Sequence, residues 1–171
     1  MDDKGLDFDD FYAAGSRRLL SQVYVMTGDL GAAEDAVAEA YARAWQNWGS
    51  LQKYGSPEAW VRTVAMRTAV SSWRKARNRL LAHRREQYTD PMAPSPDADR
   101  VMLVRALQKV PARQRQALVL HFIADLPVRE VAAEMQASEG TVKSWLSRGR
   151  AALKTELGES ASSMHRGRGE Y

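Results

Sequence analysis

One stretch of this chain, residues 126–153, constrains its fold more than any other. Two runs with apolar residues at helical spacing flank a break at Gln136 and Ala137. Ser138 follows the break and is a good N-cap residue. Glu139 then places a negative charge in the first turn of the next helix, where it suits the helix dipole. The pattern predicts two helices joined by a tight turn, which is the layout of a helix-turn-helix with its recognition helix.

The second of these helices has an apolar side and a polar side. Val142, Leu146, Gly149 and Leu153 share the apolar side, and between Glu139 and Glu156 the chain carries four cations and no acid. An ordinary helical hairpin is the alternative interpretation. Small hydroxyl residues beside cations favour a helix that lies close in the major groove of DNA. The candidate DNA contacts are Thr141, Lys143, Ser144, Ser147, Arg148 and Arg150.

Charge is strongly segregated along the chain, although the formal net charge is only +4. Residues 1–48 carry nine acids and four bases, whereas residues 60–85 carry eight bases and no acid. Residues 86–99 carry four acids, and the rest of the chain is basic again. This segregation indicates two kinds of partner, one basic and one polyanionic.

The acidic part predicts two helices, at 8–26 and at about 31–48. Gly28 is expected to end the first, and Asp29 or a residue just after it to cap the second. Acids cluster in the first turns of the second helix; they either stabilise its dipole or form a docking face for a basic partner. These acids are Glu34, Asp35 and Glu39, and the residues of this helix expected to be buried are Ala33, Val37, Ala40, Tyr41, Ala44, Trp45 and Trp48.

The basic part predicts a loop at 49–57 and a third helix at about 57–85, with Pro57 near its first position. A run of cations on a helix is often only a solvated face. Eight cations without an acid repel one another unless a polyanion is bound, so we favour nucleic acid as the ligand. Trp60 lies at core spacing in this helix and is expected to be buried.

Residues 86–98 contain three prolines and read as a flexible acidic linker. Two helices are expected at 98–123, broken at Val110 and Pro111, with Phe122 and Ile123 on the apolar side of the second. His121 has no second ligand at metal spacing and is expected to be structural. Residues 158–171 are polar and are expected to be disordered.

The predicted fold class is all-α, with two small helical domains joined by a flexible linker and a helix-turn-helix in the second. The domains are expected at 1–85 and 99–157. The chain contains no cysteine, and it shows no phosphate-binding glycine loop or zinc motif. We therefore expect no enzyme activity, no cofactor and no metal site. An acidic start without an apolar run predicts no signal peptide and no membrane insertion, and hence a cytoplasmic protein.

Three blocks in this order resemble the extracytoplasmic-function (ECF) sigma factors of bacterial RNA polymerase. They are DAVAEAYARAW at 35–45, PEAWVRTVAMRTAVSSWRKARNR at 57–79 and GTVKSWLSRGRAAL at 140–153. The resemblance implies a promoter-specificity subunit that binds core polymerase and reads the −35 and −10 promoter elements. It also implies duplex DNA at −35 and single-stranded DNA at −10.

The resemblance assigns roles to particular residues. Asp35 and Glu39 would dock on the polymerase, whose β′ and β subunits are the implied partners. An anti-sigma protein is a further partner that such factors commonly have. A flipped −10 base needs apolar or aromatic surface, and the separated strand needs cations for its phosphates. Trp60 is a further candidate for that surface, with a core position as the equal alternative. The residues implied at −10 are Leu51, Tyr54, Arg62, Arg67, Arg74, Lys75 and Arg77.

Three positions depart from the family pattern. Ala38 stands where glutamine is often found, Thr68 where asparagine is common, and Trp145 where arginine is common. Trp145 either packs against the domain core or stacks on the DNA backbone, and we favour packing because it adjoins the apolar Leu146. Two other functions are open. A free-standing helix-turn-helix regulator would bind an operator as a dimer without polymerase, and an adaptor that binds only proteins would show no dependence on DNA.

Overall fold

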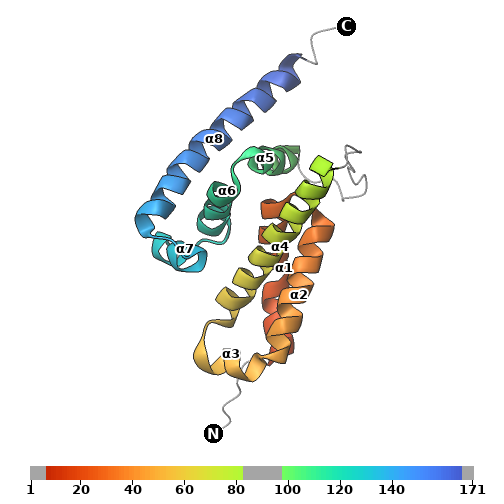
Figure 1. Cartoon of the computed structure of the whole chain (residues 1–171), viewed down its shortest axis with the longest axis vertical. Coiled ribbons are helices and arrows are strands. Elements are labelled where there is room, and N and C mark those ends of the chain that lie inside the picture. The colour runs from red at the N-terminus through yellow and green to blue at the C-terminus, as the bar shows by residue number, and fades with distance from the viewer. Residues whose placement is uncertain (1–6, 83–97, 167–171) are drawn as a thin grey trace. The chain divides into compact units, whose positions relative to one another are not determined.

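The computed structural model describes residues 7–82 and 98–166. Within these ranges the chain is helical apart from short connections, and it divides into two compact units, Met1–Arg79 and Leu80–Tyr171 (Figure 1). The predicted all-α fold with two helical domains is therefore confirmed. The predicted acidic linker lies almost entirely outside the described residues.

The first unit is built on two helices that pack against each other, α1 (Phe8–Thr27) and α2 (Leu30–Gln46). Gly28 ends α1 with a φ of 70°, a left-handed conformation that glycine adopts without a steric penalty. The Asp29 side chain caps α2 by accepting a hydrogen bond of 3.0 Å from the backbone N–H of Ala32. Both predicted helix boundaries are confirmed.

An aromatic cluster fills one end of this unit. The Trp48 ring lies 4.9 Å from the Phe11 ring and 5.3 Å from the Phe8 ring, and Phe11 also contacts Tyr41. Tyr41 is only 3% exposed. Burial, together with the nearby Tyr12 and Glu58, raises the pKa of Tyr41 to about 12. The cluster therefore ties the start of α1 to α2 and to the segment that follows it.

That following segment is a helix, and the loop predicted at 49–57 is wrong. Residues Trp48–Tyr54 form α3, which packs through Trp48, and only Gly55 and Ser56 separate it from α4 (Pro57–Ala82). Ser56 caps α4, since its Oγ accepts a hydrogen bond of 3.3 Å from the Ala59 N–H. Figure 1 shows α3 at one end of the unit. The α4 residues that enter the core are Val61, Ala65, Met66 and Ala69.

Between residues 98 and 166, the second unit contains five helical elements. They are α5 (Ala98–Lys109), α6 (Ala112–Leu118), the π-helical turn η1 (Val119–Ile123), α7 (Val128–Met135) and α8 (Glu139–Arg166). Arg115, which is 2% exposed, fixes the turn between α5 and α6. Its guanidinium donates to Gln108 Oε1 at 2.6 Å and to the Val110 carbonyl at 3.2 Å. Burial lowers the pKa of Arg115.

The π-helical turn η1 changes which side chains face the core. The Ala124 N–H donates to the Val119 carbonyl, five residues back, at 2.9 Å. The prediction that Phe122 and Ile123 line the core is wrong: they are 55% and 42% exposed. His121 Nδ1 lies 2.7 Å from the Leu126 carbonyl oxygen and so fixes the connection to α7. The expected structural role of His121 is confirmed.

The helix α8 packs closely against α6 and is longer than the sequence predicts. A Cβ atom at Gly149 would lie 3.0 Å from Leu118 Cδ1 and 3.2 Å from Gln114 Cβ, which is tighter than most Cβ contacts, so glycine favours this close crossing of α8 and α6. The helix then continues without interruption to Arg166. The predicted disorder after residue 158 is therefore wrong for residues 158–166, and residues 167–171 lie outside the described part of the chain.

Candidate nucleic-acid interface

The turn between α7 and α8 has the predicted capping chemistry. Gln136 ends α7 in a left-handed conformation with a φ of 53°. Ser138 Oγ accepts a hydrogen bond of 3.1 Å from the Thr141 N–H and lies 2.8 Å from Thr141 Oγ1. The first turn of α8 is thus closed by side chains, and the predicted N-cap is confirmed. Part of the hydrogen-bonding capacity of Thr141 is already used in this cap.

The outer side of α8 is a strip of small residues between two rows of larger side chains. Ser144, Ser147 and Ala151 are exposed and, at spacings of three and four, form the strip. Residues on the other side of the helix, Val142 and Leu146, are buried. The first row consists of Lys143, Arg150 and Lys154, and the second includes Thr141 and Arg148; all five are exposed.

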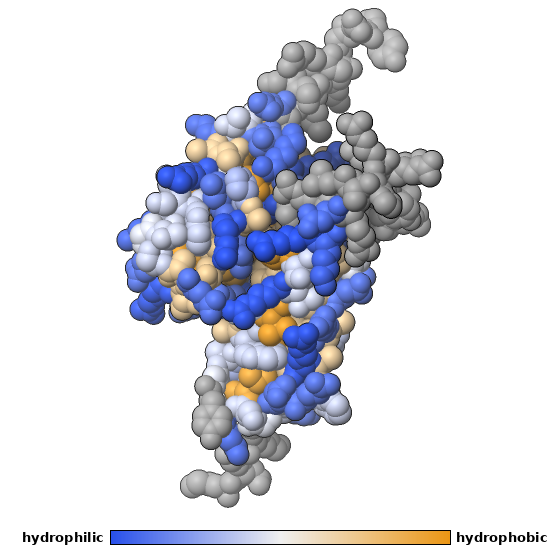
Figure 2. Space-filling model, in the orientation of Figure 1, coloured by the Kyte–Doolittle hydropathy of each residue, from blue (hydrophilic) through white to orange (hydrophobic). Residues whose placement is uncertain are grey.

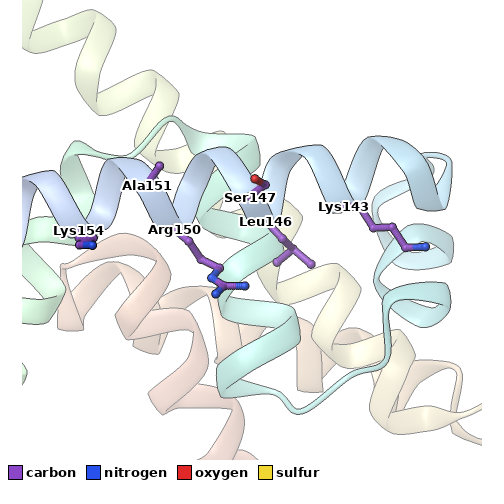
Figure 3. A pocket seen from close by; sticks show the side chains of 6 residues that line it. All are labelled: Lys143, Leu146, Ser147, Arg150, Ala151 and Lys154. Atoms are coloured by element: carbon purple, nitrogen blue, oxygen red, sulfur yellow. The ribbon is translucent and has the colours of Figure 1, made fainter.

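An open hollow runs along the first of these rows. Figure 3 shows the six side chains that line it on successive turns of α8. Backbone can approach a ligand closely at Ser147 and Ala151, while the ammonium and guanidinium groups reach past them. The arrangement suits a polyanion whose charges lie beside a groove that the helix enters. The lining residues are Lys143, Leu146, Ser147, Arg150, Ala151 and Lys154.

Trp145 lies on the second row and faces a neighbouring helix. Its ring is half-buried, and the guanidinium carbon of Arg113 in α6 lies 5.9 Å from the ring centroid. This distance fits a cation–π contact. The half-buried ring and its nearness to α6 agree with packing inside the domain, and the alternative of stacking on the DNA backbone stays untested.

In the first unit, α4 exposes several cations, whereas Arg62 lies on the side of the buried residues. Arg67, Arg74 and Lys75 are exposed, and Arg67 and Arg74 lie two turns apart on the side opposite Val61 and Ala65. Leu51, Trp60 and Arg62 are half-buried. The side chains of Tyr54 and Arg77 lie outside the described part of the structure.

The acidic side of α2 is exposed, with Asp35 and Glu39 on neighbouring turns. Glu39 forms an ion pair with Arg43 one turn later. The prediction that Trp45 is buried is wrong, because it is 67% exposed. Spacings of three and four place it on the side of α2 that carries Ala38 and Ala42. An aromatic ring beside carboxylates makes this side of α2 a candidate surface for protein contact.

Trp45, Arg113 and Lys154 are candidate functional residues that the sequence pattern did not single out. Trp45 has the spacing of a core residue, but apolar spacing does not show which side of a helix no other helix covers. The contact between Arg113 and Trp145 depends on how α6 crosses α8. Lys154 carried a usable signal, since it continues the spacing of Lys143 and Arg150 along one row.

The described surface is mostly hydrophilic on the face drawn in Figure 2, with small hydrophobic areas between charged side chains. Among residues 7–82 and 98–166, no group of three His, Cys, Asp or Glu side chains is placed to hold a metal ion. No helix in the described part of the chain is long and apolar enough to cross a membrane.

Two helical units, one with a capped helix-turn-helix and one with an exposed row of cations, define a DNA-binding protein of the helix-turn-helix class. Comparison with known families agrees at both units. Residues 11–79 match the model of sigma-70 region 2, and residues 100–153 match that of sigma-70 region 4.

Whole-chain relatives narrow the class. The ECF RNA polymerase sigma factor SigL of Mycobacterium tuberculosis is 31% identical over 140 residues, which cover 78% of this chain and 79% of SigL. The RNA polymerase sigma-E factor of Streptomyces coelicolor is 30% identical over 154 residues, which cover 89% of this chain and 86% of the relative. The chain belongs to the extracytoplasmic-function sigma factors, the subunits that direct RNA polymerase to specific promoters.

Solved structures support the same fold. The sigma factor RpoE of Bartonella quintana, in complex with the anti-sigma factor NepR, superposes with a TM-score of 0.74 at 24% identity and covers 88% of this chain and 96% of RpoE. CnrH, in complex with the cytosolic domain of CnrY, superposes with a TM-score of 0.63 at 19% identity and covers 89% of this chain and 88% of CnrH.

Proposed function

We propose that this sigma factor reads duplex −35 DNA with the outer side of α8. The observation that carries the proposal is the strip of Ser144, Ser147 and Ala151 between two rows of exposed polar and cationic side chains. Small residues let the helix enter the major groove, where each flanking row can place one side chain on the bases and another on the phosphates beside the groove. In this arrangement Lys143, Ser144, Ser147 and Arg148 face the bases, and Thr141 and Arg150 contact the backbone.

The −10 element is assigned to the first unit. Arg67, Arg74 and Lys75 supply exposed cations on one side of α4 for the phosphates of a separated strand. Leu51 offers apolar surface from α3, the short helix that leads into α4. Arg62, and Tyr54 and Arg77 from their places in the sequence, complete the proposed set.

Docking on core polymerase is assigned to the acidic side of α2, through Asp35 and Glu39 against the β′ subunit. Exposed carboxylates favour a basic partner surface. The protein acts in the cytoplasm as a subunit without catalytic activity of its own. An anti-sigma protein is a further proposed partner, because two of the similar folds, RpoE and CnrH, were solved with NepR and with the cytosolic domain of CnrY.

Run-off transcription with purified core polymerase tests the function as a whole. Transcription starts mapped after induced expression supply the promoter fragment. We expect a product of defined length only when this protein, core enzyme and an intact promoter are all present. A product that forms equally well from a promoter with scrambled −35 and −10 elements would overturn the proposal. A tight dimeric complex on duplex DNA without polymerase would favour a free-standing regulator instead.

Substitutions separate base reading from phosphate contact. Arg148→Ala is expected to change which −35 bases are tolerated and to cost about 1–3 kcal/mol of discrimination at one position. Arg74→Ala is expected to weaken binding with little dependence on sequence. A uniform loss across all −35 variants for Arg148→Ala would remove its base-reading role and leave it a phosphate contact.

A further inference from the structure

We propose that Arg113 of α6 is an additional DNA-phosphate contact and that the ring of Trp145 holds it in position. This inference rests on the proposed −35 interface of α8. The guanidinium carbon of Arg113 lies 5.9 Å from the centroid of the Trp145 ring. Arg113 is exposed and Trp145 is half-buried, so the ring is fixed by its domain while the guanidinium faces solvent.

The position of Trp145 on α8 places Arg113 beside the proposed DNA contacts. Trp145 follows Thr141 by four residues and precedes Arg148 by three, so the three side chains share one edge of the helix. Lys143 and Arg150 occupy the other edge. On the edge formed by Thr141, Trp145 and Arg148, the cation from α8 itself is Arg148. Arg113 adds a second cation to this edge from α6.

The crossing of α6 and α8 fixes where Arg113 lies. Gly149, one turn after Trp145, meets Leu118 and Gln114 of α6 so closely that a Cβ atom there would come within 3.0 Å of Leu118 Cδ1. Gln114 is the neighbour of Arg113 in the chain. The backbone at Arg113 is therefore held by contacts that do not involve its own side chain.

A stacked arginine is well suited to a phosphate. A guanidinium placed over an aromatic ring can keep the N–H groups in its plane free to donate to phosphate oxygens. Stacking also limits the rotamers that a long side chain must give up on binding.

The experiment uses the full chain assembled with core polymerase and the mapped promoter fragment, titrated at several salt concentrations. Arg113→Ala is expected to lower promoter affinity about tenfold. The slope of log affinity against log salt should become shallower by about 1. Preference among −35 sequences should stay unchanged. Unchanged affinity and slope for Arg113→Ala would overturn the proposal. Arg105→Ala, a change to an exposed arginine of α5, is the matched control and should leave both quantities unchanged.

The positioning role of Trp145 is tested by comparing the promoter affinity of a variant that keeps an aromatic ring with that of a variant that lacks one. Trp145→Phe retains an aromatic face and should retain most of the affinity, whereas Trp145→Leu fills space without a cation–π contact and should lose as much as Arg113→Ala. The double variant Arg113→Ala/Trp145→Leu should lose no more than either single variant. Parental binding by Trp145→Leu would show that the ring only packs. If Trp145→Leu does not fold, Arg113→Lys decides the point: it keeps the charge but not the flat group, and parental affinity would overturn the stacking role.

Failure of this inference is distinguishable from failure of the interface. If Arg148→Ala changes −35 recognition and Arg113→Ala has no effect, only the role of Arg113 is overturned. If neither substitution affects promoter binding, the −35 assignment to α8 is overturned together with the inference that rests on it.

Discussion

Gln136 is a residue whose backbone conformation costs stability. It ends α7 with a φ of 53°, and a left-handed conformation costs a residue with a Cβ atom about 1–2 kcal/mol. Gln136→Gly should therefore raise the unfolding free energy of the second unit by about 1 kcal/mol. Chemical denaturation measures this. The matched control Ala133→Gly adds a glycine to an exposed position inside α7 and should lower stability by a similar amount.

Tyr41 gives the first unit a pH dependence in alkali. Its pKa is raised to about 12, chiefly by burial, so the folded protein holds this proton more tightly than the unfolded chain does. The resulting stabilisation is fully present below pH 10 and is lost as the pH rises from 10 towards 12. Unfolding free energies measured at several pH values should fall more steeply for the parent protein than for Tyr41→Phe. Equal slopes for the two proteins would contradict this assignment.

At the scale of the elements, the crossing of α6 and α8 depends on Gly149. Alanine favours helix by about 1 kcal/mol over glycine. Here, however, the new Cβ would meet the buried Leu118 at 3.0 Å and the backbone-linked Cβ of Gln114 at 3.2 Å. Gly149→Ala is expected to destabilise the second unit by about 1–2 kcal/mol, as measured by thermal unfolding. In Gly140→Ala the new Cβ would meet only Ser138 Oγ, at an ordinary contact distance of 3.9 Å, so this change should be neutral or stabilising.

The short helix α3 depends on Trp48, whose ring packs on Phe8 and Phe11. Trp48→Ala should lower the unfolding free energy by about 2–3 kcal/mol, since this ring is half-buried. Because α3 carries Leu51, transcription from a duplex promoter should fall more than transcription from a template already melted at −10. Trp45→Ala, at a ring 67% exposed, is the stability control and should change the unfolding free energy by about 0.5 kcal/mol or less. Equal losses on both templates for Trp48→Ala would contradict a role of α3 at −10.

At the scale of the whole molecule, opposite charges are assigned to different units and different partners. Asp35→Lys should weaken the binding of core polymerase and leave the −35 preference of assembled holoenzyme unchanged. Lys143→Ala should leave the binding of core polymerase unchanged and alter the −35 preference of assembled holoenzyme. Because the two changes act on separate equilibria, their effects on initiation should add in free energy. Competition for core enzyme and promoter titration measure the two steps, and a large interaction energy in the double variant would contradict separate roles.

Local chemistry accounts for what could be predicted from the sequence. Gly28, Asp29 and Ser138 mark helix ends because capping depends on neighbouring backbone groups only. The prediction of burial failed for Trp45 and Phe122, because apolar spacing shows that a face exists and not which part of it another helix covers. Gly49 and Gly55 signal a loop in the sequence, although the structure has the helix α3 there. This helix is held by packing of Trp48 on Phe8 and Phe11, which lie far from it in the sequence. The place of Arg113 depended on a crossing of helices that spacing cannot supply.

The uninterrupted run of α8 links its two ends mechanically. Its 28 residues span about 42 Å as a single helix, with the proposed DNA contacts in its first half. Because α8 is one continuous helix, a change in the orientation of its first half also reorients its second half. A spectroscopic label at the exposed Glu159 should therefore report reorientation of the end proposed to contact DNA. The second half of α8 is therefore a labelling site at which promoter binding can be followed without changing the residues proposed to read the bases.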